Sequence, residues 1–126
     1  MKLKKFNFKI VNSTNDRAIQ IIKNTNNKSG IVIAEKQKRG RGQYGKKWTS
    51  FKGNLFVSIF FPANMIKLPL KDLTKMNCFF VKKLLSNFYK GKITIKKPND
   101  LLIDNMKISG ILQEILSKSG ETFIIV

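Results

Sequence analysis

The chain has 126 residues, of which 42% are hydrophobic, so it is long enough for one domain with a buried core and too apolar for wholesale disorder. A single cysteine excludes an internal disulfide framework and a cysteine-cluster metal site, and the lack of histidine excludes histidine-dependent catalysis and histidine-ligated zinc. The net charge of +18 is typical of a protein that binds a nucleic acid or an acidic partner. Lysines dispersed over a solvated surface would give the same charge without any such partner.

The N-terminus is basic, but no apolar stretch of the length found in secretory signals follows it. No apolar run approaches the roughly 20 residues that a membrane-spanning helix needs. The sequence therefore predicts a soluble, cytoplasmic protein without a membrane partner.

In the first half of the chain, loose alternation of apolar residues predicts a short strand over 6–10. Ser13 followed three positions later by Asp16 is a variant of the capping box and predicts a helix that runs to about Lys23. The other elements expected in this half are a buried strand over 31–34, an exposed flexible loop over 36–47 and a strand over 54–61 that ends at Pro62.

In the second half, apolar residues recur at helical spacing between Pro69 and Phe88, with Gly91 just beyond. A strand over 92–96 follows, then a hairpin of strands 101–103 and 108–116 around an Asp104-Asn105 turn, and a turn over 117–120 leads into a strand over 122–126. The fold class predicted is α+β, a largely antiparallel mixed sheet flanked by helices in one domain over 1–126. Because the sequence stops inside an apolar strand, a further C-terminal portion is expected.

A glycine-rich basic segment, Arg39 to Trp48, offers the first candidate chemistry. Gly40, Gly42 and Gly45 match the dinucleotide-binding pattern, but no helical periodicity follows them, so the Rossmann interpretation fails on context. Gly40, Gly45 and Lys46 also have the spacing found at the start of a Walker A loop. The next residue in such a loop is a Ser or Thr that binds magnesium, and here it is Lys47, so this interpretation fails too. What remains is a loop that can fold over an anion with backbone N–H groups and Arg41.

The second candidate segment runs from Lys96 through Asn99 and Asp100 to Lys107 and Gly110. A carboxylate and an ammonium group on this hairpin are able to hold a metal–phosphate complex. The alternative, which the residues by themselves favour, is a Pro-Asn-Asp turn with an exposed ion pair of little energetic value.

Taken in order, the motifs Ser13-Thr14-Asn15, Gln37, Gly40-Arg-Gly-Gln-Tyr-Gly-Lys-Lys-Trp48, Lys96-Lys-Pro-Asn-Asp100 and Lys107-Ile-Ser-Gly-Ile-Leu112 resemble the catalytic domain of biotin–protein ligases. The resemblance covers roughly residues 6–126 and departs from the family where a second loop arginine is Gln43 and where an aromatic residue is Lys97. It implies a chain that is incomplete at the C-terminus, without the family's helix-turn-helix and C-terminal small barrel.

The resemblance implies a ligase that uses ATP and Mg²⁺ to convert biotin to biotinyl-5′-adenylate and then biotinylates a lysine of a biotin carboxyl carrier domain. It gives catalytic roles to Arg41, Lys107 and Asp100, with Asp100 near the acceptor lysine or the metal. The implied biotin-binding residues are Ser13, Thr14, Asn15, Gln37, Gly40, Arg41, Gln43, Lys107, Gly110 and Leu112. The implied ATP- and adenylate-binding residues are Arg41, Gly42, Gly45, Trp48, Lys96, Asn99 and Lys107.

Three alternatives stay open on the sequence. The chain is an inactive fragment of such a ligase, a lipoate or octanoate ligase of the same fold, or a basic nucleic-acid-binding module. The last is favoured by charge alone, because Phe56, Phe60 and Phe61 are expected in the core rather than on an open base-stacking face. Specific DNA binding is not expected, and a homodimer is possible.

Overall fold

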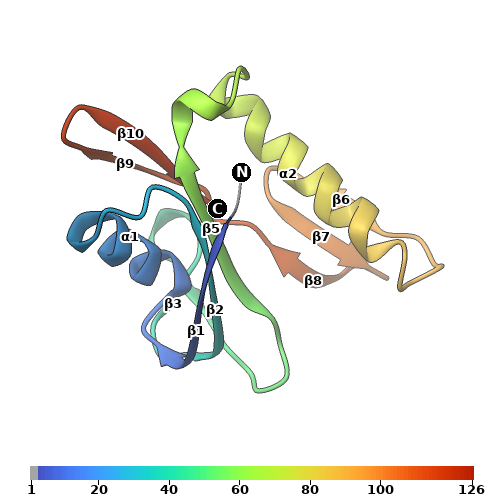
Figure 1. The fold of residues 1–126 in the computed structure, drawn as a ribbon. Helices are drawn as coiled ribbons and strands as arrows, with labels where there is room; N and C mark the ends of the chain where they lie inside the picture. The colour runs from blue at the N-terminus through green and yellow to red at the C-terminus, as the bar shows by residue number, and fades with distance from the viewer. Residues whose placement is uncertain (1–2) are drawn as a thin grey trace. The chain divides into compact units, whose positions relative to one another are not determined.

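The structure is a computed structural model that describes residues 3–126 and divides the chain into two compact units (Figure 1). The first unit comprises the residues up to Ile66 together with Gln113–Val126, and the second comprises Lys67–Leu112. Each unit is described by itself below. The assignment of 1–126 to one domain stays a prediction.

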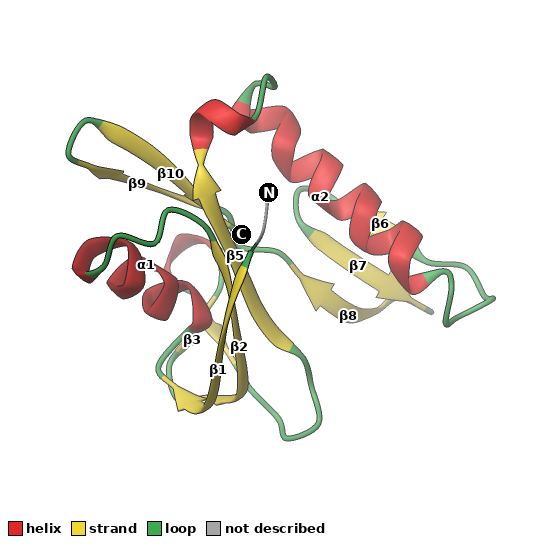
Figure 2. Cartoon of the chain, viewed as in Figure 1, coloured by secondary structure: helices red, strands yellow, loops and turns green. Residues whose placement is uncertain are grey.

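The first unit is built on a five-stranded sheet with the order β1-β2-β5-β10-β9 (Figure 2). Strands β1 and β2 are parallel and the other neighbours are antiparallel. The elements of this unit are β1 (Lys4–Val11), α1 (Thr14–Asn24), β2 (Gly30–Gln37), β3 (Gly40–Arg41), η1 (Gln43–Gly45), β4 (Lys47–Trp48), β5 (Phe56–Pro62), η2 (Ala63–Met65), β9 (Glu114–Lys118) and β10 (Glu121–Ile125).

Helix α1 begins where the sequence predicts it. Ser13 is the N-cap, and its hydroxyl accepts a hydrogen bond from the backbone N–H of Asp16 at 3.3 Å. Ala18, Ile21 and Ile22 recur at helical spacing and are buried against the sheet. At the other end of the helix, the ammonium group of Lys118 donates to the carbonyl oxygens of Ile22 at 2.6 Å and Thr25 at 3.0 Å.

The core of the first unit lies between α1 and the sheet. Its centre is Phe60, which is fully buried and packs with Val32 of the neighbouring strand. Burying a phenylalanine side chain of this kind contributes roughly 1.5–3 kcal/mol. Phe56 is also buried, so the expectation that the aromatic residues of this strand belong to the core is confirmed for Phe56 and Phe60, whereas Phe61 is half-buried.

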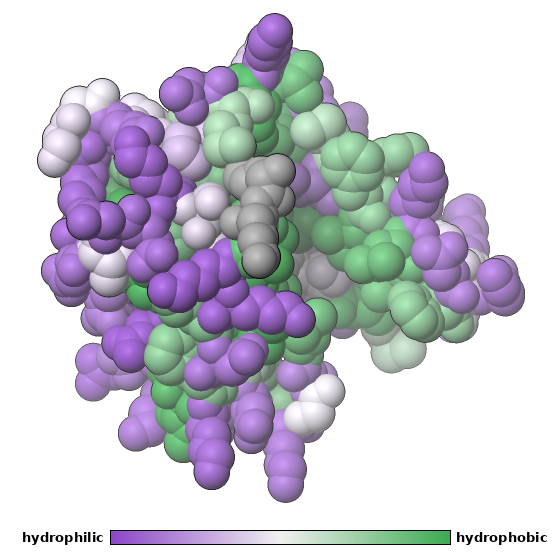
Figure 3. Space-filling model, viewed as in Figure 1, coloured by the Kyte–Doolittle hydropathy of each residue, from purple (hydrophilic) through white to green (hydrophobic). Residues whose placement is uncertain are grey.

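The second unit contains α2 (Leu70–Leu85) and a three-stranded antiparallel sheet of β6 (Thr94–Lys96), β7 (Asp100–Ile103) and β8 (Met106–Gly110). Helix α2 packs on β7, where Leu73, Cys78 and Leu101 are buried. Several large apolar side chains of α2 are exposed in this unit (Figure 3), among them Phe79, Phe80 and Leu84. Within residues 3–126, neither helix combines the length and the apolar character needed to cross a membrane.

Two sequence predictions are wrong in detail. The expected strand 108–116 is two strands, β8 and β9, which belong to different sheets and are separated by residues 111–113. The expected flexible loop 36–47 contains a small hairpin, in which Gly40 pairs with Trp48 and Arg41 with Lys47. The α+β class and the largely antiparallel sheet are confirmed.

Candidate functional site

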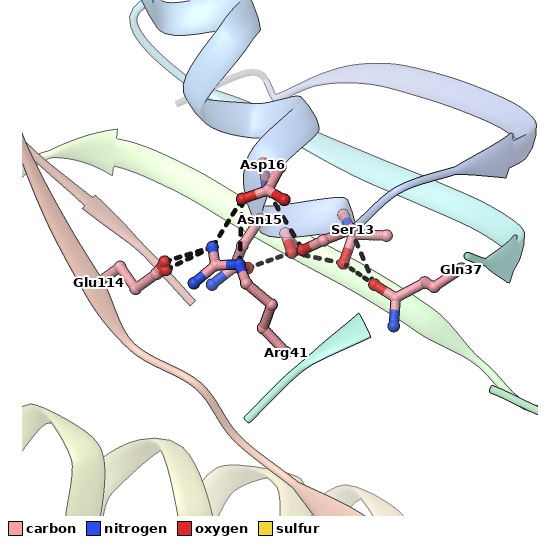
Figure 4. A network of polar contacts seen from close by, with 8 residues as sticks. Ser13, Asn15, Asp16, Gln37, Arg41 and Glu114 are labelled. Carbon is pink, nitrogen blue, oxygen red and sulfur yellow. Dashed lines mark hydrogen bonds and ion pairs between the residues drawn. The ribbon is translucent and has the colours of Figure 1, made fainter. Parts of the chain in front are cut away.

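The predicted site residues of the first unit gather at the start of α1. Ser13, Thr14 and Asn15 are buried there, and Gln37 reaches them from the end of β2 (Figure 4). The Oε1 atom of Gln37 accepts hydrogen bonds from the backbone N–H of Thr14 at 2.8 Å and from its hydroxyl at 3.2 Å. The two segments, 23 residues apart in the chain, are thus joined by direct contacts.

Ser58 extends this group of polar side chains from the sheet beneath. It is 1% exposed, and its Oγ lies 2.8 Å from Thr14 Oγ1 and also contacts Asn15 Oδ1. A serine hydroxyl carries one proton, so it donates to only one of these two oxygens. The residues Thr14, Asn15, Gln37 and Ser58 are called the polar chain below. Buried polar groups of this kind are stable only when they are paired, and here they pair with one another.

Arg41, on the glycine-rich hairpin, is held by two carboxylates. Its Nη2 lies 2.6 Å and 2.8 Å from the two carboxylate oxygens of Glu114, and its Nη2 and Nε lie 2.7 Å and 3.1 Å from Asp16 Oδ1. The hydrogen bond to Glu114, followed by the one to Asp16, raises the pKa of Arg41 above its ordinary value, although partial burial acts against this. The guanidinium therefore stays charged at any accessible pH.

The glycine-rich hairpin brings Arg41 to this place through a close backbone approach. Gly40 is buried, and a Cβ added to it would lie 2.7 Å from the carbonyl oxygen of Trp48 and 2.9 Å from Nε2 of Gln37. The hairpin is closed by the backbone N–H of Gly42, which donates to the carbonyl oxygen of Lys46 at 2.7 Å. Gly40 is thus required where β3 passes both β4 and the polar chain.

The remaining predicted residues of this segment are more exposed. Gln43 and Gly45 lie in the η1 turn, where Tyr44 has a positive φ of 56° and is 95% exposed. Trp48 in β4 is half-buried. These residues belong to the same hairpin as Arg41, but their part in binding ATP stays a prediction.

The predicted residues of the second unit gather on its three-stranded sheet. Lys107 Nζ lies 2.9 Å from Asp100 Oδ1, so the ion pair that the sequence suggested is present, with side chains 43% and 20% exposed. Asn99 donates through Nδ2 to the carbonyl oxygen of Ile111 at 2.7 Å, which fixes the chain after β8. Lys96 is exposed on β6, and Gly110 and Leu112 are half-buried at and after the end of β8.

The hairpin that carries Asp100 and Lys107 turns where the sequence predicts. Asp104 and Asn105 both have positive φ, 50° and 61°, as a tight two-residue hairpin turn requires. A register shift between Leu101 and Leu102 then places Lys107 opposite Leu102 and Asp100 opposite Gly110. The long lysine side chain spans the remaining distance to the carboxylate.

A cavity of about 330 Å³ opens beside α1 in the first unit. Ser13 and Asp16 line it, together with Arg17 and Lys38, but Gln37 and Arg41 do not. The cavity is therefore a neighbour of the polar chain and offers room for part of a ligand. Its two cationic side chains suit the acidic end of such a ligand.

Three residues of this site were not expected as functional residues. Asp16 was assigned only to helix capping, and Glu114 and Ser58 lay inside apolar segments predicted as strands. A single acidic or hydroxyl side chain within an apolar strand does indicate a buried polar contact, because a buried polar side chain needs a partner. Nothing in the sequence pattern identifies Arg41 as the partner of Glu114, 73 residues away.

The comparisons with known proteins agree with this geometry. A family profile described as "Biotin/lipoate A/B protein ligase family" matches residues 7–126. The chain is 34% identical over 119 residues to the bifunctional ligase/repressor BirA of Escherichia coli strain K12, covering 93% of this chain and 36% of that protein. The chain therefore spans about a third of the length of this curated relative.

Two solved structures extend the comparison to the fold. The biotin acetyl coenzyme A carboxylase synthetase of Helicobacter pylori, crystallised with biotinylated ATP, matches with a TM-score of 0.82 at 24% identity, covering 98% of this chain and 59% of the other. The biotin protein ligase of Leishmania major in complex with biotinyl-5-AMP matches with a TM-score of 0.77 at 25% identity, covering 99% and 56%.

Proposed function

The chain belongs to the biotin/lipoate A/B protein ligase family, and on this premise we propose that it carries the catalytic core of a biotin–protein ligase. In the first step the carboxylate of biotin attacks the α-phosphorus of ATP, and pyrophosphate leaves. In the second step the amine of a carrier lysine attacks the carbonyl carbon of biotinyl-5′-adenylate, AMP leaves, and the amine loses a proton.

The observation that carries the proposal is the position of Arg41 beside the polar chain. The ureido ring of biotin is neutral and carries both N–H donors and a carbonyl acceptor, so it needs polar partners in a buried site. Thr14, Gln37 and Ser58 supply such partners from two strands and a helix. The dithiolane ring of lipoate has no comparable groups and would form no such hydrogen bonds with these side chains, which disfavours it.

Arg41 supports the first step by its charge. A carboxylate that approaches a phosphate meets another anion, so a guanidinium fixed next to both reduces their repulsion and stabilises the charge that develops during transfer. The guanidinium is half-buried in the structure, where such an interaction is stronger than in bulk water. Lys107 keeps the role that the resemblance implies, contact with the biotin carboxylate and the adenylate phosphate.

Mg²⁺ enters with ATP in this proposal. It is usually bound by one or two carboxylates and by substrate phosphates, and it neutralises phosphate charge when bound. Within residues 3–126 no group of three or more His, Cys, Asp or Glu side chains gathers for a metal ion. Asp100, the acid that the resemblance puts near the acceptor lysine or the metal, is the carboxylate that we propose would contact Mg²⁺ in the complex with ATP.

The acceptor in this proposal is a biotin carboxyl carrier domain, and the net charge of +18 suits an acidic one. We propose the cytoplasm as the compartment of the reaction, because ATP is available there. A homodimer is compatible with the proposal, and binding to a specific DNA sequence forms no part of it.

The test is biotin-dependent exchange of pyrophosphate into ATP by the purified chain, with lipoate and no acid in parallel. We expect exchange with biotin, a loss of about 10²-fold in Lys107→Ala because a charge contact to the reacting anions is removed, and no loss in Lys75→Ala. Lys75 is a matched control because it is exposed and lies 3.7 Å from its own acidic partner, Asp72.

Two other results of the exchange assay would change the assignment. Exchange with lipoate instead of biotin moves the assignment to the lipoate branch of the family. No exchange with any acid, from a chain that is folded by circular dichroism, makes this chain an inactive part of a ligase.

A further inference from the structure

Arg41 is anchored by carboxylates from two different elements. Asp16 comes from the first turn of α1, and Glu114 is the first residue of β9. Both bind the same edge of the guanidinium, since all four hydrogen bonds are donated by Nε and Nη2. With two carboxylates on one edge, the plane of the guanidinium is fixed as well as its position.

The opposite corner of the guanidinium takes no part in this anchoring. The hydrogen bonds to Asp16 and Glu114 all come from Nε and Nη2 and do not use Nη1, which carries two N–H groups. A guanidinium held by Nε and Nη2 keeps the N–H groups of Nη1 for a further acceptor. A charged N–H group of this kind forms a strong hydrogen bond to a carboxylate or a phosphate oxygen.

The hairpin that carries Arg41 is short. Strands β3 and β4 are two residues long each, and Tyr44 at the tip is almost fully exposed. An arginine on such a hairpin samples many rotamers unless it is anchored. Glu114 is the more buried anchor, with a side chain 19% exposed against 38% for Asp16, so its bond to Arg41 is less weakened by solvent.

We propose that Glu114, assisted by Asp16, is a positioning residue that fixes Arg41 so that Nη1 faces the anions of the adenylation step. The inference rests on the proposed function for its substrate and on the observed ion pairs for its geometry. Glu114 acts through Arg41 and does not touch the reacting atoms.

The opposite interpretation is that the two carboxylates mask Arg41 and oppose anion binding. The trio of Arg41, Asp16 and Glu114 has a net charge of −1, so this interpretation has a physical basis. It predicts the opposite sign in experiment: removing a carboxylate strengthens ATP binding and speeds exchange.

The first test is a double-mutant cycle on pyrophosphate exchange. Glu114→Gln keeps the shape of the side chain and removes its charge, and we expect kcat to fall about 10²-fold, the cost of misplacing a group that contacts the reacting atoms. In an Arg41→Ala background the same substitution is expected to have no further effect, because its partner is gone. Glu121→Gln is the matched control, since Glu121 lies on β10, which pairs with β9, and its carboxylate lies 2.9 Å from the ammonium group of the exposed Lys28.

The second test does not depend on activity. Hydrogen exchange of the peptide that covers residues 40–48, followed by mass spectrometry, is expected to be faster in Glu114→Gln and unchanged in Glu121→Gln. The free energy of unfolding of each variant is measured by urea titration. If it is unchanged while hydrogen exchange over residues 40–48 is faster, the effect is local to the hairpin and does not involve the whole fold.

The outcomes distinguish a failure of the proposed ligase function from a failure of the positioning role of Glu114. If the wild-type chain shows no exchange with biotin, the proposed function fails, and hydrogen exchange alone decides whether Glu114 anchors the hairpin. Unchanged hydrogen exchange in Glu114→Gln overturns the positioning role. An equal loss of activity with and without Arg41, or faster pyrophosphate exchange in Glu114→Gln, also overturns it.

Discussion

At the scale of single residues, Ser58 links the sheet to the start of α1. It is a small polar side chain in the middle of an apolar strand, between buried Phe56 and Phe60. A hydroxyl at this depth is retained only with partners, and its partners are Thr14 and Asn15 of the polar chain.

Replacing Ser58 by alanine tests this link. We expect Ser58→Ala to lower the free energy of unfolding by about 1–3 kcal/mol, because the partner atoms lose a buried hydrogen bond, and to raise the KM for biotin. Ser86→Ala is the control, since the hydroxyl of Ser86 is exposed and bonds only the carbonyl oxygen of Lys82 at a helix end. A loss no larger than that of Ser86→Ala would show that Ser58 is not linked to the polar chain.

Cys78 gives a prediction on pH. Burial of the thiol, and secondarily the negative charge of Asp100, raise the pKa of Cys78. The folded state therefore keeps its proton to higher pH than the unfolded state, so the stability that this group contributes is present below the ordinary thiol pKa of about 8.5 and is lost as pH rises through the raised value.

We expect the free energy of unfolding of the wild type to fall more steeply than that of Cys78→Ala between pH 8 and pH 10 (about the window set by the thiol). Urea titrations at several pH values measure both slopes. Parallel slopes would mean that the thiol titrates alike in the folded and unfolded chain.

At the scale of elements, the β3–β4 hairpin depends on one small residue. A side chain at Gly40 would collide with backbone on β4 and with Gln37, whereas a Cβ at Gly42 would lie 3.6 Å from its nearest neighbours, an ordinary contact. The two glycines are thus sterically different although they are two positions apart.

Gly40→Ala is expected to displace the hairpin and Gln37 together. The predicted results are faster hydrogen exchange over residues 40–48 and a rise of about tenfold or more in the KM for biotin, because overpacking of this kind costs about 1–3 kcal/mol. Gly42→Ala is the control for the fold of the hairpin only, and its hydrogen exchange should match the wild type. Equal hydrogen exchange in the two variants would contradict the steric argument.

The elements also show what the sequence could and could not predict. Helix α1, its cap and the Asp104-Asn105 turn were predicted, because each depends on residues close together in the chain. The division of 108–116 into β8 and β9 was missed, because an apolar run looks the same whether it continues in one sheet or passes to another. The pairing of Arg41 with Glu114 was missed for a similar reason, since it depends on tertiary structure alone.

At the scale of the whole molecule, the excess of positive charge is the dominant electrostatic feature. The hydrophilic side chains are spread over the face seen in Figure 3 rather than gathered in one patch. With 25 basic and 7 acidic residues, most cations have no acidic partner available, and their mutual repulsion opposes the compact state.

Salt is therefore expected to stabilise the chain. Raising NaCl from about 10 mM to about 150 mM shortens the Debye length from about 30 Å to about 8 Å and screens this repulsion. We expect the free energy of unfolding in urea to increase over this range. A decrease would show that the ion pairs of Arg41 and Lys107, which salt weakens, outweigh the repulsion between the lysines.

Strand β9 is linked to both ends of helix α1. Glu114 binds Arg41, which in turn binds Asp16 in the first turn, and Lys118, four residues later, binds carbonyl groups at the end of the helix. The two contacts to Arg41 and Ile22 span 73 and 96 residues of chain. During synthesis on the ribosome, the helix and the glycine-rich hairpin therefore emerge long before the strand that anchors them. Order in the site is thus acquired late in translation, when β9 has left the ribosome.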